Sequence, residues 1–510
     1  MKNNYIYVVM LFIFATFSAI ATPGKTSLSG KITDKESGQP IPGVTIYIPD
    51  LKTGAVTGMD GTYKIDNLPQ TKLFLQVSFI GYKSITEIVD LSTTTTKDFV
   101  LEASVKEMNE VVITGLSQAG ERQRTPTPIQ VVPQIQLLQN ASTNIIDAIA
   151  KQPGISQITT GAGISKPVIR GLGYNRVVVV NDGIRQEGQQ WGDEHGIEID
   201  EFSVNRVEIL KGPASLSYGS DAIAGVINML SAPTLPDGSI QGNVTGNYQT
   251  NNGLIGYSAN IAGNLTGLIW DLRYSNKMAH DYKNKYDGTV FNSRYREQNM
   301  GGIIGVNKSW GYSHIHFSMY NLNPGIVEGD RDSLTGKFIK PIAIDDSTEG
   351  TEIANGADFK RYKPATPFQQ INHYKAVLNN NFIVGNGSVK ATIGFQQNRR
   401  QEFSDVLMPD AYGLYFLMNT MNYDVRYTMN RKNNFNVSVG VNGMKQESQN
   451  KGTEFLVPEY NLFDIGVFTI LKKSFDKLDI SGGIRYDSRD ERGKDLYVDA
   501  NGIPTTVTDS

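Results

Sequence analysis

The sequence predicts a mainly β protein in three successive parts: a small β-sandwich, a mixed α/β domain, and an antiparallel sheet of long strands that crosses a membrane as a β-barrel. Composition points to sheets and tight turns, because 51 of the 510 residues are Gly, where about 7% is usual, and Tyr (24) and Phe (21) far outnumber Trp (3). Short apolar runs between Gly, Pro and Asp turns fill residues 27–101. From residue 240 onward, apolar and polar residues alternate over about ten residues at a time, the length of a tilted membrane-spanning strand.

Composition also excludes several classes of protein. The chain has no Cys, which excludes a disulfide scaffold, a thiolate metal site and a Cys nucleophile. A formal net charge of −3 gives no reason to expect a nucleic acid as partner. The hydrophobic content of 39% is too low for a helical membrane protein, but it is compatible with a membrane β-barrel, whose lumen side is polar.

The first 21 residues are typical of a signal peptide. Lys2 supplies a positive charge, residues 5–17 form an almost unbroken apolar run, and Ala19-Ile20-Ala21 fits the small-x-small cleavage rule. The alternative is a single membrane-spanning helix, which needs about 20 apolar residues, more than this run provides. We therefore expect export, with cleavage after Ala21.

Residues 22–101 contain the predicted sandwich. A strand at 44–48 lies between turns at 38–43 and 57–61. The pattern G-x-I-x-D, G-x-P-I-P-G-V-x-I and T-x-x-D-G-x-Y-x-I, spread over residues 30–65, resembles the carboxypeptidase-regulatory-like domain, a transthyretin-like sandwich. This resemblance implies a non-catalytic appendage.

A linker at residues 102–124 contains a short β-prone peptide. Its residues are Glu110, Val111, Val112, Ile113 and Thr114. A peptide of this kind in a polar stretch can add as a strand to the exposed sheet edge of another protein. Any buried strand could have the same composition, so the peptide alone is a weak signal.

The next part, residues 125–231, mixes helix and strand. Ser142-Thr143-Asn144 predicts the N-terminal cap of a helix that Pro153-Gly154 ends. Residues 177–180 are all Val and predict a strand, which an Asn181-Asp182-Gly183 turn closes.

This α/β part resembles the plug domain of TonB-dependent outer-membrane transporters. The motifs occur in the order of that family: Asp147-Ala148-Ile149, Pro153-Gly154-Ile155, Val168-Ile169-Arg170-Gly171, Val178-Val179-Val180-Asn181-Asp182-Gly183, Arg206-Val207-Glu208-Ile209-Leu210-Lys211-Gly212-Pro213-Ala214-Ser215 and Gly225-Val226-Ile227-Asn228. The resemblance implies that residues 110–114 are the TonB box, the strand that an inner-membrane energy-transducing complex pulls.

The resemblance also implies site residues. In that family, plug arginines meet acidic residues of the barrel wall, and Arg170 and Arg206 are the candidates for such a latch; an ordinary contact within the fold is the alternative. A plug loop that touches the ligand corresponds here to Gln190, Trp191, Asp193, Glu194 and His195. The last three offer oxygen and nitrogen donors suited to a metal or a metal complex, and the Trp could stack on a flat chelate. The alternative is a turn with solvated charges and one packed Trp, so no metal ligand is firm.

Residues 232–510 are predicted to form the barrel wall. Strands at 374–384 and 388–397 are joined by the tight turn Gly385-Asn386-Gly387, whereas residues 321–372 would form a long extracellular loop. About eleven strands can be counted, but a 22-stranded wall at about ten residues per strand needs well over 400 residues. We therefore expect the N-terminal part of a barrel that looks truncated.

Two histidines lie on one predicted strand of this wall. His314 and His316 alternate with Ile315 and Phe317, so both should point into the lumen. A role in metal binding is open, with simple lumen-lining polarity as the alternative.

The parts together predict TonB-dependent active transport of a scarce metal complex, of the ferric siderophore, haem or cobalamin type. The expected location is the outer membrane of a Gram-negative cell, with the N-terminal domain and the plug base facing the periplasm. The expected partners are the TonB complex, outer-membrane lipid and a small metal chelate. Alternatives are uptake of free metal ions, glycan import, and a surface adhesin of β-sandwich domains. No Walker loop or HExxH motif is present, so neither an enzyme nor a cofactor is expected.

Overall fold

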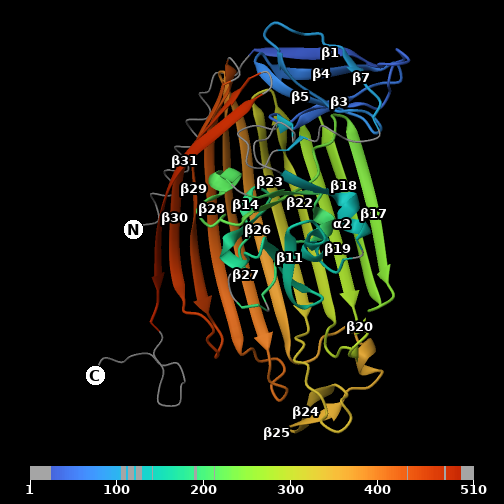
Figure 1. The fold of residues 1–510 in the computed structure, drawn as a ribbon, viewed down its shortest axis with the longest axis vertical. Coiled ribbons are helices and arrows are strands. Elements are labelled where there is room, and N and C mark those ends of the chain that lie inside the picture. The colour runs from blue at the N-terminus through green and yellow to red at the C-terminus, as the bar shows by residue number, and fades with distance from the viewer. Residues whose placement is uncertain are drawn as a thin grey trace.

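The computed structural model describes residues 24–104, 111–112, 120–121, 129–140, 142–188, 192–193, 195–211, 213–432, 435–475 and 478–495. Figure 1 shows its three parts: a sandwich at one end, an α/β domain in the middle, and a tall sheet behind them. The predicted signal peptide, residues 1–21, lies outside the described residues. Within the described residues, no helix is both long and apolar enough to cross a membrane.

Two small sheets form the N-terminal sandwich. One has the strand order β4-β1-β7 and the other the order β3-β2-β5-β6. Their bounds are β1 Lys25–Asp34, β2 Thr45–Ile48, β3 Thr53–Val56, β4 Thr62–Pro69, β5 Lys72–Ser78, β6 Ile85–Asp90 and β7 Phe99–Leu101. Because side chains alternate along a strand, one side of each sheet faces a shared core, in which Leu28, Ile46 and Leu75 are fully buried.

The α/β domain, called the plug below, comprises the described residues from 129 to 230. Its five-stranded sheet has the order β10-β15-β16-β13-β14, so β10 and β14 are edge strands. The bounds are β10 Ile129–Pro133, α2 Gln134–Gln139, α3 Ile145–Ala150, β11 Ile155–Gly161, β12 Ile164–Ile169, β13 Val177–Asn181, β14 Ile184–Arg185, β15 Arg206–Leu210 and β16 Gly225–Leu230, with 3-10 helices at Tyr174–Arg176, Glu201–Ser203 and Pro213–Tyr218. The cap of α3 is the predicted one, since the Asn144 side chain accepts the backbone N–H of Asp147 at 3.0 Å.

Eleven long strands form the large sheet, each antiparallel to its neighbours. Their bounds are β17 Ser239–Gln249, β18 Leu254–Leu265, β19 Leu268–Ala279, β22 Tyr295–Lys308, β23 Gly311–Pro324, β26 Phe368–Val384, β27 Gly387–Phe403, β28 Leu414–Lys432, β29 Phe435–Asn450, β30 Tyr460–Ser474 and β31 Asp479–Gly493. Within the described residues the sheet does not close on itself, because β17 and β31 are its two edges. The predicted fold class is confirmed, including a barrel wall that is open.

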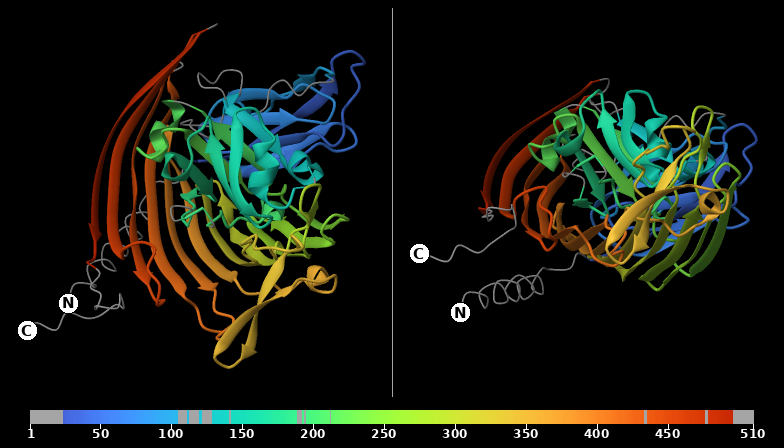
Figure 2. Two further views of the ribbon diagram at one scale, coloured as in Figure 1. Left: turned by 60° about the horizontal axis from the view of Figure 1, so that its bottom comes forward. Right: turned by 90° about the horizontal axis from the view of Figure 1, so that it is seen from below.

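The two faces of the large sheet differ in polarity. On β23, the Ile315 side chain is 53% exposed, whereas its neighbours His314 and His316 are 1% and 6% exposed. Both histidines therefore lie on the inner face, as the alternation predicts. The inner face is concave and wraps around the plug (Figure 2).

The two ends of the sheet have different connections. Short turns lie near the sandwich, as between β26 and β27, where Gly385 has a φ of +55°. Long connections lie at the opposite end, where residues 325–367 include the hairpin of β24 (Ile339–Asp345) and β25 (Thr348–Ile353). A second small hairpin there pairs β20 (Lys283–Asn284) with β21 (Gly288–Thr289).

Candidate functional site at the plug–sheet contact

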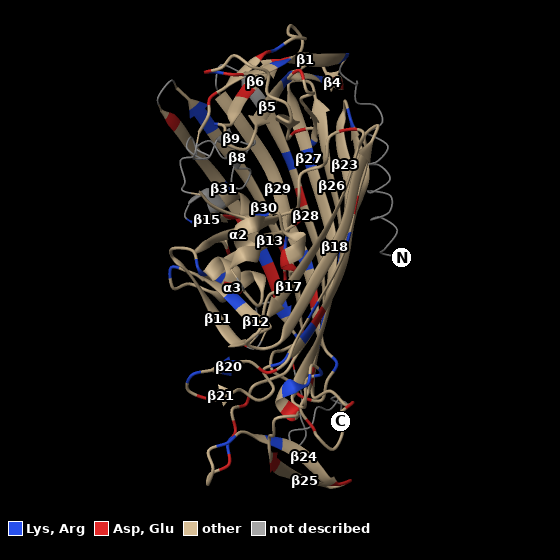
Figure 3. Ribbon diagram, turned by 90° about the vertical axis from the view of Figure 1, so that its right-hand side faces the viewer, with Lys and Arg blue, Asp and Glu red and all other residues tan. Residues whose placement is uncertain are grey.

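The plug meets the concave face of the sheet through charged side chains. Four plug carboxylates each contact a basic side chain of the sheet: Asp182 contacts Lys375 and His316, Glu198 contacts Arg400, Glu201 contacts Lys277, and Asp221 contacts Arg489. Charged positions of both signs accordingly lie where the plug faces the inner strands (Figure 3). In the part of the chain that the structure describes, each of these pairs has its acid on the plug and its base on the sheet.

The first pair lies in the turn between β13 and β14. Asp182 and Gly183 have φ values of +56° and +88°, so the Asn181-Asp182-Gly183 motif forms the predicted tight turn. This turn presents the carboxylate to the Lys375 ammonium at 2.8 Å. Burial alone would raise the pKa of Asp182, but Lys375 and His316 outweigh it and hold the pKa well below its usual value. The turn therefore carries a fixed negative charge.

The second pair lies in the segment between β14 and β15. Glu198 is buried and hydrogen-bonds Arg400 of β27 through one carboxylate oxygen, while His373 Nδ1 of β26 lies 3.9 Å from the other. Burial raises the pKa of Glu198 to about 7, and Arg400 only partly offsets it. This carboxyl, which lies at the plug–sheet contact, can therefore gain or lose a proton near neutral pH.

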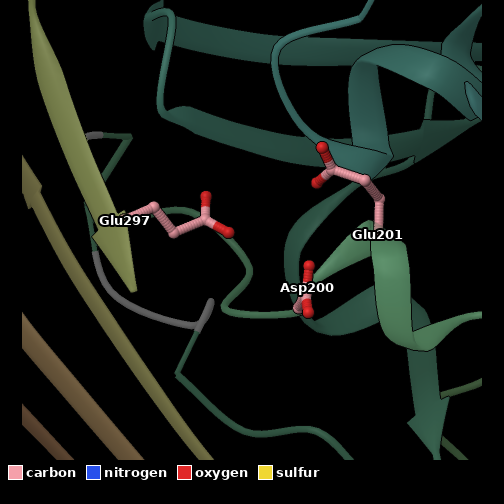
Figure 4. Close-up of side chains that lie close together, drawn as sticks. All are labelled: Asp200, Glu201 and Glu297. Atoms are coloured by element: carbon pink, nitrogen blue, oxygen red, sulfur yellow. The ribbon is translucent and has the colours of Figure 1, made fainter. Parts of the chain in front are cut away.

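A cluster of three carboxylates forms the third contact. Glu297 extends from β22 toward Asp200 and Glu201 of the plug (Figure 4), and the three offer oxygen atoms within 4.8 Å of one another. The Lys277 ammonium lies 2.6 Å from Glu201 and 2.9 Å from Glu297, so it supplies the positive charge that a metal ion would otherwise bring. Burial, partly offset by Lys277, raises the pKa of Glu201 to about 7. The arrangement is that of a buried ion-pair cluster in which one ammonium is shared by neighbouring carboxyl groups.

The fourth contact joins the plug to the last strands of the sheet. The Arg489 guanidinium on β31 lies 2.7 Å from Asp221 and also contacts Asp464 on β30. Arg185 of the plug contacts the same Asp221 carboxylate. Burial opposes ionisation of Asp221, but the two arginines hold its pKa below the usual value.

The predicted ligand loop is described only in part. Gln190, Trp191 and Glu194 lie outside the described residues. Asp193 is exposed and accepts a hydrogen bond from the Tyr174 hydroxyl, whereas His195 is buried, with its ring against Phe416 at 5.9 Å. Burial, with Arg400 and Lys166 nearby, holds the pKa of His195 well below its usual value, so the ring is neutral. The two described residues do not share a metal cluster, and the assignment of ligand contacts stays a prediction.

The two arginines expected to form a latch have other surroundings. Arg206 pairs at 2.9 Å with Glu208, which is fully buried and belongs to the same strand. Arg170 is exposed, with a φ of +50° in the turn after β12. Among the described residues neither arginine contacts an acid of the large sheet. The latch assignment of Arg170 and Arg206 stays a prediction, and the described ion pairs between plug and sheet instead join plug acids to sheet bases.

The predicted TonB box is also described only in part. Val111 and Val112 form the short strand β8 (Val111–Val112), which pairs antiparallel with β9 (Gly120–Glu121). Glu110, Ile113 and Thr114 lie outside the described residues. The described part is thus extended backbone that already has a partner within the chain.

Sequence reasoning missed the plug acids, although a weak signal for them exists. The run Ile197-Glu198-Ile199-Asp200-Glu201 places charges among apolar residues, as buried carboxylates would require. On the sheet side, His373 and Lys375 occupy successive inward positions of β26. Neither pattern alone identifies its partner, because the partners lie far apart in the sequence.

Two family models match the chain. The CarboxypepD_reg-like domain matches residues 28–113, and the TonB-dependent receptor plug domain matches residues 121–226. A TonB-dependent receptor of Formosa agariphila is 29% identical over 43% of this chain and 21% of its own length. The iron-regulated outer membrane virulence protein of Vibrio cholerae is 33% identical over 25% of this chain and 20% of its own length. The matched regions thus span about a fifth of these relatives.

Solved structures share the fold at low sequence identity. The FrpB iron transporter from Neisseria meningitidis aligns over 71% of this chain and 59% of its own, with a TM-score of 0.56 and 16% identity. The ferric yersiniabactin uptake receptor FyuA from Yersinia pestis aligns over 75% and 60%, with a TM-score of 0.51 and 15% identity. The plug motifs, the sheet that surrounds the plug and these likenesses agree: the chain carries a CarboxypepD_reg-like domain followed by a TonB-dependent receptor plug domain, and its fold resembles that of TonB-dependent receptors.

Proposed function

We propose that this chain serves TonB-dependent active transport of a scarce metal complex, of the ferric siderophore, haem or cobalamin type, across the outer membrane of a Gram-negative cell. The similar structures support this class of cargo, since they include a ferric yersiniabactin receptor and a hemophore receptor in complex with its hemophore and heme. In this proposal the apolar outer face of the sheet contacts lipid, and the sandwich and the base of the plug face the periplasm. No chemical conversion is involved.

The observation that carries the proposal is the set of ion pairs that hold the plug against the sheet. The apolar core of the plug lies within the domain, whereas its described ion pairs with the sheet join Asp182, Glu198, Glu201 and Asp221 to basic side chains. Buried ion pairs cost desolvation that roughly cancels their attraction, so they fix position more than they add stability. Such contacts suit a domain that must be held in a defined position and yet be displaced during transport.

The coupling strand lies just before the plug. In the proposed mechanism the TonB complex adds a strand to residues 110–114, so the β8–β9 pairing would be exchanged for pairing with the partner. Tension on this peptide is then transmitted along the linker to β10, the first strand of the plug.

The test is deletion of residues 110–114, with ligand uptake and ligand binding at the cell surface measured in parallel. We expect binding to persist and uptake to fall to background, because the ligand site and the coupling strand are separate. Deletion of residues 115–119, five linker residues outside the box, is the matched control and should leave uptake intact. Unchanged uptake after deletion of 110–114 would contradict the assignment.

Uptake of free metal ions is a second candidate function. One observation favours it: two buried histidines, His314 and His316, line a cavity on the sandwich side of the plug. Growth on defined iron, copper and zinc sources would separate the two cargo classes.

A further inference from the structure

A cavity of about 520 Å³ lies where the sandwich, the plug and the sheet meet. The sandwich contributes the turn between β2 and β3, which is tied to the sheet by its backbone. The carbonyl of Lys52 accepts a hydrogen bond from the Asn307 amide at 2.5 Å, and the carbonyl of Asp50 accepts one from the Asn381 amide at 2.7 Å. The plug contributes the Asp182 turn. The cavity is therefore lined by all three parts.

His314 and His316 line this cavity from β23, and their hydrogen bonds fix the tautomers. The Asn307 amide nitrogen donates to Lys52, so its oxygen is the acceptor that lies 2.6 Å from His314 Nε2. Nε2 therefore carries the proton of the neutral ring, and His314 Nδ1 has a lone pair. In the same way, His316 Nδ1 lies 3.3 Å from an Asp182 oxygen and donates to it, which leaves the lone pair on Nε2.

The His316 lone pair is unused. The side chain is only 6% exposed, and its Nε2 has no hydrogen-bond partner among the described residues. A buried acceptor without a donor costs free energy, so this atom in the cavity wall is available to bind a ligand that enters the cavity. The carboxylate behind the other ring nitrogen completes an arrangement that orients imidazole ligands of metals and raises their basicity.

We propose that His314 Nδ1 and His316 Nε2 bind one divalent transition-metal ion that prefers imidazole, Cu²⁺ or Zn²⁺, within this cavity. The two rings share one face of β23, with centroids 6.3 Å apart. Imidazole ligands suit copper and zinc, and Cu²⁺ binds most tightly in the divalent series. The remaining coordination positions of the ion would be filled by water or by ligands that the ion brings. This inference rests on the second candidate function, uptake of free metal ions, and deepens it, because it assigns the ion a place on the sandwich side of the plug.

Lys52 of the sandwich acts as a competing cation at this site. Its ammonium lies 3.4 Å from His314 Nδ1 and 4.6 Å from the ring centroid of Tyr312. The ammonium therefore uses the lone pair that the metal ion needs. Displacement of the β2–β3 turn would uncover the histidine pair, so the sandwich controls access to it.

The test uses the purified, tag-free protein in detergent, titrated with Cu²⁺ and followed by calorimetry and electron paramagnetic resonance. We expect one equivalent of bound copper, with hyperfine lines from two imidazole nitrogens. The double variant H314N/H316N should lose this signal, whereas H280N, which removes a histidine outside the cavity, should keep it. The variant D182N should weaken binding by about 10–100-fold, as loss of an outer partner of a ligating histidine does.

The variant K52M tests the site independently of folding defects, because the expected result is tighter copper binding, which a misfolded protein would not give. Removal of a like charge close to the site should tighten copper binding by about tenfold or more. Nitrogen hyperfine lines that persist in H314N/H316N would overturn the site, and unchanged affinity in K52M would overturn the role of Lys52. Deletion of residues 110–114 should leave copper binding intact, so failure of this site and failure of the transport proposal are distinguishable.

Discussion

Lys375 on β26 and Asp182 in the β13–β14 turn form an ion pair of 2.8 Å that joins the plug to the concave face of the sheet. The Lys375 side chain is 1% exposed and that of Asp182 is 14% exposed, so neither charge is solvated well enough to remain alone. The two residues lie on different parts of the fold, and the contact exists only when the plug is seated.

The substitution Lys375→Met should loosen the plug. It leaves the buried Asp182 carboxylate without its main partner, and breaking a buried pair on one side costs about 3–5 kcal/mol. Thermal unfolding and limited proteolysis of the plug would measure the loss. The double variant Asp182→Asn with Lys375→Met should recover much of it, and strictly additive losses would contradict the pairing. Arg492→Met removes an exposed pair with Asp490 on the same sheet and should change nothing measurable.

The plug–sheet contact should weaken as the pH rises from about 5 to 7.5. The pKa of Glu198 is raised to about 7 by burial, from an ordinary value of 4.5. A carboxyl whose pKa is raised in the folded state binds its proton more tightly there than in the unfolded state. Its contribution to folding stability is therefore fully present below pH 4.5 and is lost as the pH rises through about 7. Glu201, also raised to about 7, acts in the same direction, whereas the lowered pKa of Asp182 matters only at more acidic pH.

Hydrogen exchange of the plug amides at several pH values, corrected for intrinsic rates, would measure this dependence. Protection should fall across the window, by an amount on the order of 3 kcal/mol for each of the two groups at most. Glu198→Gln should flatten the profile, because a neutral amide cannot ionise. A profile that rises with pH in the wild-type protein would contradict this prediction.

Gly225→Ala should disrupt the plug sheet. Gly225 begins β16 with a φ of +147°, and an added Cβ would lie 2.2 Å from the carbonyl oxygen of Leu210 on β15. Backbone strain and overpacking together cost about 2–5 kcal/mol. Gly161→Ala is the matched control within the plug, since an added Cβ there meets nothing within 4 Å. Equal protease resistance of the two variants would show that Gly225 does not constrain the sheet.

Much of the fold could be predicted from local patterns. The alternation around Ile315 identifies which face of β23 is inward, Asn144 caps its helix, and the Asn181-Asp182-Gly183 motif makes its turn. Each of these features depends on residues close in sequence, so the period of the strand or the chemistry of the turn is sufficient.

The plug–sheet pairs could not be predicted in the same way. Glu198 and Arg400 are 202 residues apart, and their contact depends on where the plug sits in the sheet. Arg206, by contrast, has a partner close in sequence, because Glu208 lies two positions away on the same face of β15. Side chains two positions apart on a strand lie on the same face, so a local pair of this kind can be predicted from the sequence.

The edge position of β10 has a mechanical consequence. In the part of the chain that the structure describes, it pairs with β15 alone, from Ile129 opposite Leu210 to Pro133 opposite Arg206. A pull that arrives through the linker loads the Ile129–Leu210 pair first, and each later pair bears the load only after the one before it has opened. Strand β10 would thus separate from β15 one residue pair at a time, at a force set by one pair rather than five, while the rest of the sheet keeps its pairing.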